Sequence, residues 1–261
     1  MKSLKAKLQD GDCPLGSWLQ IGDETVAEIM VQAGFDWIVI DLEHSAIDLN
    51  QCLRMMRIID LYGVSPLVRL TSNDPLQIKR VMDCGAHGVV VPMVNSKEDA
   101  DRAVKAVRYP PIGERSVGLF RAQGYGQSLD EYRAWLENES VVIVQIEHIK
   151  AVEDLDSILE VDGIDALIVG PYDLSGSLGV LGELNHPLVM GALDRVLNTA
   201  RERGVPAGTH VVSTDPQVAR TALEGGFDFI AFGVDCLFLG ETARTGITDL
   251  RRIISETGRT S

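Results

Sequence analysis

Acidic side chains follow two neighbouring apolar runs of the sequence, at the point where each run ends. Glu147 ends the run VVIVQIE, and Asp173 follows the run LIVGP. If both runs are parallel strands of one sheet, the two carboxylates lie at the same edge and suit a hard divalent cation such as Mg2+ or Mn2+. Either carboxylate could instead cap the helix that follows its strand. The pattern alone leaves both interpretations open.

A histidine and an arginine stand at comparable positions earlier in the chain. His44, in IDLEHSAID, carries an imidazole that titrates near neutrality and suits proton transfer to or from a substrate hydroxyl, with Asp41 or Glu43 to orient it. A histidine that is only hydrogen-bonded at a helix start is an equal alternative. Arg69 ends the apolar run PLVR, and its guanidinium needs an anion there. A protein carboxylate is slightly favoured over a substrate as that anion.

The segment 170–179, GPYDLSGSLG, begins with a glycine and a proline before a predicted helix start. Its backbone N–H groups could hold a carboxylate, although an ordinary tight turn has the same composition. The other histidines show no ligand spacing and are expected to be structural: His87, His148, His186 and His210.

No lysine stands where a Schiff-base aldolase needs one. Such an enzyme requires a lysine at a strand end in a desolvated pocket, whereas the lysines here lie in the N-terminal segment or in helical patterns, with Lys150 the nearest to a strand end. If the protein makes or breaks a carbon-carbon bond beside a carbonyl, a metal must stabilise the enolate.

Eight short apolar runs must position these residues. They alternate with amphipathic segments that open on Ser or Asp and close on Gly, the signals that start and stop helices. Runs buried on both faces, separated by helices, predict an α/β fold in which a single (β/α)8 TIM barrel spans residues 1–261. The runs begin near residues 16, 37, 65, 88, 141, 165, 206 and 227.

Two segments depart from this alternation of strands and helices. The stretch 109–127, YPPIGERSVGLFRAQGYGQ, is long and rich in Gly, Pro and Arg, so we expect it over the active-site mouth or at a subunit contact. The stretch 237–256 predicts a C-terminal helical extension that packs on the barrel or on a neighbouring subunit.

The composition restricts the partners. A net charge of -14 repels nucleic acid and anionic membranes, so an anionic substrate would need a local cation, an arginine or backbone N–H groups. The four cysteines form no CxxC pair. Residues 1–12 lack the apolar stretch of a signal peptide, and no apolar run reaches membrane-spanning length. A cytoplasmic protein with a small-molecule substrate is expected.

Several motifs together resemble the HpcH/HpaI aldolase family, and the resemblance runs in order through nearly the whole chain. These enzymes are class II, metal-dependent pyruvate aldolases of the phosphoenolpyruvate/pyruvate barrel superfamily, which reversibly cleave 4-hydroxy-2-oxo acids to pyruvate and an aldehyde. The motifs are DLEHSAID (41–48), LVRL (67–70), DCGAHGVVVPMV (83–94), RYPPIGERSVG (108–118), VQIE (144–147), GIDALIVGPYDLSGSLG (163–179) and FGVD (232–235).

The resemblance implies a role for each candidate residue. Glu147 and Asp173 would bind Mg2+ or Mn2+, with Co2+ or Zn2+ as other metals, and pyruvate would chelate the cation. Arg69 would neutralise the enolate oxygen, and His44, supported by Asp41, would move the proton of the aldol hydroxyl. The pyruvate carboxylate would be held by Gln145 and the segment Gly170, Pro171, Tyr172 and Asp173. Family members form hexamers as dimers of trimers with an exchanged C-terminal helix, which implies a homo-oligomer in which Asp83 reaches a neighbouring site.

Two positions depart from the family pattern, which usually has Ser or Ala at Tyr172 and Ser or Thr at His148. Tyr172 would reshape the aldehyde side of the pocket, so the aldehyde stays open. Two alternatives remain: a citryl-CoA or malyl-CoA type of lyase, for which the sequence shows no cluster of basic residues, and a non-catalytic barrel that binds a 2-oxo acid.

Overall fold

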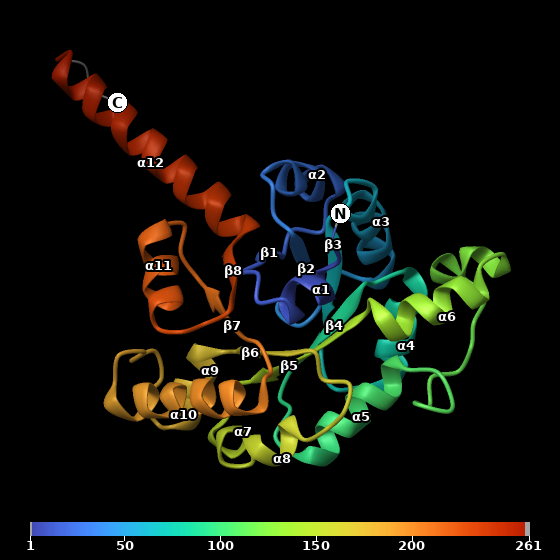
Figure 1. The fold of residues 1–261 in the computed structure, drawn as a ribbon. Helices are drawn as coiled ribbons and strands as arrows, with labels where there is room; N and C mark the ends of the chain where they lie inside the picture. The colour runs from blue at the N-terminus through green and yellow to red at the C-terminus, as the bar shows by residue number, and fades with distance from the viewer. Residues whose placement is uncertain (1, 259–261) are drawn as a thin grey trace.

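The computed structural model describes residues 2–258 and confirms the predicted barrel. Eight parallel strands hydrogen-bond in chain order, and the eighth pairs with the first, so the sheet is closed. Each strand forms at one of the predicted apolar runs (Figure 1), most of which are rich in β-branched residues. The strands are β1 (Leu15–Leu19), β2 (Trp37–Asp41), β3 (Ser65–Arg69), β4 (Gly88–Val91), β5 (Val141–Ile146), β6 (Ala166–Val169), β7 (Ala207–Val211) and β8 (Phe229–Val234).

The helices begin largely where a Ser, Asp or Pro predicts a start. Asp48, for example, accepts a hydrogen bond from the Gln51 amide and completes a capping box at the start of α3. Short helices that the sequence patterns did not identify include α7 and α8, whose five residues each cannot display a helical period. The helices are α1 (Leu4–Gln9), α2 (Glu24–Gln32), α3 (Leu49–Leu61), α4 (Pro75–Cys84), α5 (Lys97–Val107), α6 (Leu129–Asn138), α7 (Ile149–Glu153), α8 (Leu155–Leu159), α9 (Pro171–Ser177), α10 (Pro187–Arg203), α11 (Pro216–Glu224) and α12 (Asp235–Glu256), with a short 3-10 turn η1 (Arg121–Gly126).

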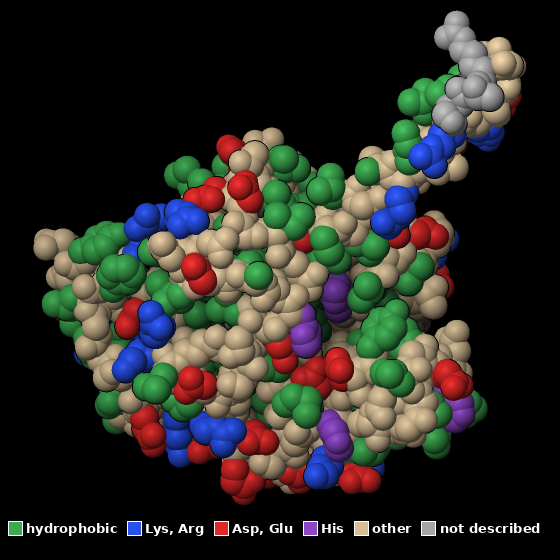
Figure 2. Space-filling view, turned by 180° about the vertical axis from the view of Figure 1, so that it is seen from behind, with side chains coloured by type: hydrophobic (Ala, Val, Ile, Leu, Met, Phe, Trp, Pro, Cys, Tyr) green, Lys and Arg blue, Asp and Glu red, His purple; other side chains and the backbone are tan. Residues whose placement is uncertain are grey.

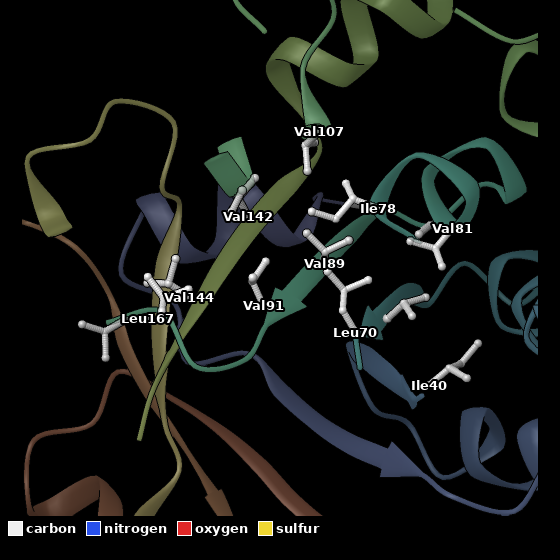
Figure 3. Packing of buried hydrophobic residues seen from close by; sticks show 14 of the residues in the cluster. Ile40, Leu70, Ile78, Val81, Val89, Val91, Val107, Val142, Val144 and Leu167 are labelled. Carbon is white, nitrogen blue, oxygen red and sulfur yellow. The ribbon is translucent and has the colours of Figure 1, made fainter. Parts of the chain in front are cut away.

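Alternation along the strands divides the core into two layers. Side chains such as Trp37, Val39 and Phe229 fill the barrel interior. The strand residues that alternate with the interior ones, such as Val89 and Val142, face outward and pack against the helices, as Figure 3 shows. Because the interior is packed with apolar side chains, polar residues reach open space only at the ends of the strands.

The stretch 109–127 does not cover the mouth of its own barrel, so the first of its two expected places is wrong, and the second, a subunit contact, stays a prediction. Arg121 donates to the carbonyl of Cys84, the last residue of α4, and pairs with Asp60 near the end of α3. In a (β/α)8 barrel the helices end at the face opposite the mouth. The stretch follows α5 rather than a strand, and a connection of that kind lies on the bottom face.

The predicted C-terminal helix is present as α12 and projects away from the barrel (Figures 1 and 2). Only Asp235, its first residue, is fully buried. Between residues 2 and 258, no helix combines the length and apolar character that a bilayer crossing requires.

Candidate active site

A small cavity of about 70 Å3 opens at the carboxyl ends of the strands. Figure 2 shows acidic and histidine side chains gathered near the middle of one face of the molecule. The cavity walls include every residue that the sequence assigned to substrate binding, together with Arg69. The lining residues are Trp18, Arg69, Gln145, Ile168, Val169, Gly170, Pro171, Tyr172, Asp173, His210 and Val212.

Glu147 is buried directly after β5, and its carboxylate is held by hydrogen bonds. The Met93 amide donates to Oε1 at 2.7 Å, and the Gln145 side-chain amide donates to Oε2. Met93 has a φ of 52°, an unfavourable backbone conformation for a residue with a side chain of this size. Residues with such strained backbone angles cluster at functional sites. His148, not Glu147, caps α7, so the interpretation of Glu147 as a helix cap is wrong.

Gly170 gives Glu147 the room that it needs. A Cβ atom at this position would lie 2.9 Å from Glu147 Oε2 and 3.0 Å from its Cβ. Any larger residue would push the carboxylate away from the cavity. The close approach, rather than the backbone angle, therefore requires glycine here.

Asp173 faces the same region from the first turn of α9. It is exposed, and the start of α9 at Gly170 has no side-chain cap, so the carboxylate is not used to cap this helix. Burial and the nearby charges of Glu43 and Asp173 raise the pKa of Glu147, although its hydrogen bonds to Met93 and Gln145 oppose the shift. Carboxylates that destabilise one another in this way suit a divalent cation, because it offsets their repulsion.

The described side chains do not form a closed metal site. Among residues 2–258, no group of three or more His, Cys, Asp or Glu side chains could hold a metal ion. A cation held by Glu147 and Asp173 alone would keep several coordination positions for substrate oxygens and water, as catalytic cation sites do.

Arg69 and Asp41 form a buried, two-bond ion pair. Arg69 Nε lies 2.9 Å from Asp41 Oδ1, and Nη2 lies 2.6 Å from Oδ2. The two residues are register partners on β2 and β3, so their side chains point the same way. Burial alone would raise the pKa of Asp41, but the hydrogen bonds and charge of Arg69 outweigh it and lower that pKa. The anion beside Arg69 is therefore a protein carboxylate, as the sequence slightly favoured.

Glu43, rather than Asp41, lies beside the imidazole of His44. The distance from His44 Nε2 to Glu43 Oε2 is 3.7 Å, and the same Glu43 oxygen lies 3.3 Å from Arg69 Nη1. Asp41 supports His44 only through the backbone, by accepting from its amide at 3.2 Å. The His44 side chain is 61% exposed, so it stands at the rim of the site where it meets solvent.

Trp18 and His210 complete the wall, although the sequence gave neither a role in the site. The Arg69 guanidinium lies 4.4 Å above the Trp18 ring, and the ring of His210, on β7, lies 5.1 Å from the Trp18 ring. His210 Nε2 lies 3.0 Å from the carbonyl oxygen of Gly233 on β8. The position of His210 near the end of β7 was the available signal.

We expect His210 to make the protein less stable in mild acid. Burial, and secondarily the charge of Arg69, lower the pKa of His210 to about 4. Between the ordinary pKa of about 6.5 and that value, the unfolded chain binds a proton that the native chain does not. The free energy of unfolding should therefore fall as the pH falls from 6.5 to 4, and less steeply in His210→Phe. Urea denaturation at pH 7 and pH 5 measures this, with His186→Asn as control; an equal pH dependence in His210→Phe would contradict it.

Asp83 and the lysines lie away from this cavity. Asp83 is near the end of α4, on the bottom face, where it pairs with Arg115 at 2.6 Å and accepts from Gln123. It cannot reach the mouth of its own barrel. Within residues 2–258 no lysine lines the cavity, and Lys150, the nearest in sequence, is exposed.

Comparisons with known proteins agree on one family. The family model described as HpcH/HpaI aldolase/citrate lyase matches residues 15–240. A hydroxypyruvate/pyruvate aldolase from Pseudomonas aeruginosa is 37% identical over 242 residues, which cover 92% of this chain and 89% of that protein. A 4-hydroxy-2-oxo-heptane-1,7-dioate aldolase from Escherichia coli is 38% identical and covers 92% of each chain.

Solved structures give the same result. The crystal structure of a family protein from Burkholderia cenocepacia J2315 superposes with a TM-score of 0.91 at 35% identity, over 96% of this chain and all of that one. An HpcH/HpaI aldolase from Desulfitobacterium hafniense DCB-2 superposes with a TM-score of 0.87 at 32% identity, over 96% of this chain and 97% of that one.

Proposed function

Because the chain belongs to the HpcH/HpaI aldolase/citrate lyase family, we propose that it is a class II pyruvate aldolase that reversibly cleaves a 4-hydroxy-2-oxo acid to pyruvate and an aldehyde. Its activity class, a carbon-carbon lyase of the aldolase type, follows from its aldolase relatives. The observation that carries the proposal is that Arg69 and Asp173 line one cavity, and that Glu147 contacts two further residues of its wall, Gln145 and Gly170. Among residues 2–258, no lysine lines this cavity.

Glu147 and Asp173 would hold the divalent cation, with Mg2+ and Mn2+ as first choices and Co2+ or Zn2+ as other metals that oxygen ligands accept. When bound, such a cation polarises the 2-oxo group of the substrate and offsets negative charge that develops there. The Gln145 amide donates to Glu147 and so fixes the carboxylate, which leaves one further hydrogen of that amide for the substrate.

The protein residues supply the remaining steps. Backbone N–H groups at the start of α9 bind the substrate carboxylate. His44 accepts the proton of the C4 hydroxyl, directly or through one water, as the C3–C4 bond breaks and the aldehyde forms. Arg69 stabilises the negative charge on the C2 oxygen with the Nη hydrogens that Asp41 leaves free, because Asp41 accepts only from Nε and from one hydrogen of Nη2. A proton then returns to C3 and gives pyruvate.

Tyr172 limits which aldehydes fit the pocket. Its side chain lines the cavity and is 46% exposed, so it meets solvent at the edge of the pocket. The family pattern has a small residue here, so this aldolase would accept a different or narrower set of aldehydes than its relatives.

Removal of the metal tests the function. We expect the protein to release pyruvate from a 4-hydroxy-2-oxo acid, to lose nearly all activity after EDTA treatment and desalting, and to regain it with Mg2+, Mn2+, Co2+ or Zn2+. The rate can be followed with a coupled lactate dehydrogenase assay that contains no added metal. Full activity after thorough metal removal would contradict the proposed mechanism.

The projecting helix α12 supports a homo-oligomer, a trimer or a hexamer. Ile247, Leu250 and Ile253 recur at a spacing of three residues, so they form one stripe along the helix, and each is about half exposed. In an isolated chain this stripe would face water, and a second subunit would bury it. Asp83, on the bottom face of one barrel, would then reach the site of a neighbour.

A charge in this stripe should disrupt the assembly. We expect the double substitution Ile247→Asp with Leu250→Asp to shift the protein to a smaller species, because assembly would bury two unpaired carboxylates. Light scattering coupled to gel filtration measures the mass. Thr248→Asp lies on the other side of α12 and serves as the control. An unchanged mass in the double variant would exclude this stripe as the interface.

A further inference from the structure

His210 is a polar residue of the cavity wall that the proposed mechanism does not use. It points into the barrel from β7, next to Trp18, and lines the same cavity as Arg69 and Tyr172. A packed barrel interior normally carries apolar residues at such positions, and a buried imidazole costs free energy unless its nitrogens find partners.

The hydrogen bond to Gly233 determines which nitrogen carries the proton. A carbonyl oxygen only accepts, so His210 Nε2, at 3.0 Å from it, must donate. Gly233 has a φ of 64°, and a Cβ there would lie 2.4 Å from Phe238, so this backbone position is closely defined. The pKa of about 4 keeps the ring neutral near pH 7. Nδ1 is then an unprotonated acceptor, and among residues 2–258 no side chain or backbone group donates to it.

A neutral acceptor selects among ligands by chemistry. Its lone pair repels carboxylate and phosphate oxygens and attracts the O–H of a hydroxyl group. We propose that His210 is a specificity-determining residue whose Nδ1 accepts a hydrogen bond from a substrate hydroxyl, so that the enzyme favours hydroxylated substrates. The proposal rests on the aldolase function above. The hydroxyl belongs either to a 3-hydroxylated 2-oxo acid, such as hydroxypyruvate in place of pyruvate, or to a 2-hydroxyaldehyde.

Four substrate pairs distinguish these sources. In the aldol direction, the full-length enzyme with Mg2+ is given pyruvate or hydroxypyruvate, each with propanal or glycolaldehyde. We expect His210→Phe, which keeps an aromatic ring against Trp18, to lower the ratio of kcat/KM for the hydroxylated over the unsubstituted compound about tenfold. A change in the donor ratio places the hydroxyl on the 2-oxo acid, and a change in the acceptor ratio places it on the aldehyde.

The conservative variant His210→Asn supplies the control. Its side-chain oxygen offers an acceptor close to the position of Nδ1, whereas its amide is too short to reach Gly233, so we expect it to restore part of the ratio. Each ratio compares two substrates on one variant, and a loss of folded protein therefore cancels. Unchanged ratios in His210→Phe, or equal losses with all four pairs, would overturn the proposal.

A binding measurement separates this proposal from the proposed function. Calorimetric titration with Mg2+ present gives the Kd of pyruvate and of hydroxypyruvate for wild type and His210→Phe. If the wild type forms no product with any pair but binds hydroxypyruvate more tightly than pyruvate, and only the wild type does so, the aldolase function fails and the role of His210 stands. If His210→Phe changes neither the Kd ratio nor the kinetic ratios, the role of His210 fails and the aldolase function stands.

Discussion

Glu147→Gln should lower kcat/KM for cleavage of a 4-hydroxy-2-oxo acid by about a thousandfold or more. Glutamine keeps the size of the side chain, but it removes the negative charge that Glu147 contributes beside Asp173. A bound cation supplies several kcal/mol of stabilisation to the transition state, which corresponds to roughly a thousandfold in rate. Calorimetric titration with Mn2+ should show a matching loss of affinity.

The fold should survive this substitution. Burial raises the pKa of Glu147, so the metal-free protein bears a cost for keeping this carboxylate charged, and the neutral amide removes that cost. Glu153→Gln, exposed in the helix that follows the same strand, serves as the matched control and should retain wild-type activity. A Glu147→Gln enzyme with more than a tenth of wild-type activity would show that Glu147 does not hold a catalytic cation.

Arg69→Met should damage both the stability and the activity of the protein. Asp41 is fully buried, and without Arg69 it becomes an uncompensated buried charge, a change that costs about 3–5 kcal/mol of unfolding free energy. Loss of the guanidinium at the C2 oxygen should also lower kcat by about 100-fold to 1000-fold. Urea denaturation and the pyruvate assay measure the two effects separately.

The double variant Asp41→Leu with Arg69→Met separates stability from catalysis. Two apolar side chains of similar volume replace a buried ion pair, and such replacements are often neutral for stability. We therefore expect the double variant to be more stable than Arg69→Met and equally inactive. A double variant that is as unstable as the single one would mean that the cost does not come from the unpaired Asp41 carboxylate.

The ion pair between Asp41 and Arg69 also makes the free energy of unfolding depend on pH at strongly acidic pH. The pKa of Asp41 is lowered in the folded protein, so its contribution to stability is complete above the unfolded pKa of about 3.9 and disappears as the pH falls through the folded value. The decline in stability between pH 6.5 and 4 therefore belongs to His210 rather than to Asp41.

The sequence alone was sufficient to predict the barrel and to predict which residues lie at its mouth. Eight apolar runs separated by helical patterns have few compact arrangements, and in a closed parallel sheet all strand ends of one polarity meet. Glu147, Asp173 and Arg69 could therefore be assigned to one face from their positions at the ends of runs. The prediction that the stretch 109–127 lies over the mouth was wrong, because its composition does not show whether it follows a strand or a helix.

Only the tertiary structure decided how these side chains pair. The register of β2 against β3 brings Asp41 to Arg69, and the backbone of Met93 and the missing side chain of Gly170 position Glu147. His210 looked structural because the carbonyl that fixes its proton belongs to Gly233, 23 residues away in the sequence. The physical reason is the separation along the chain between the groups that interact. Hydrophobic periodicity is local and can be read along the chain, whereas hydrogen-bond partners and protonation depend on groups that come together only when the barrel closes.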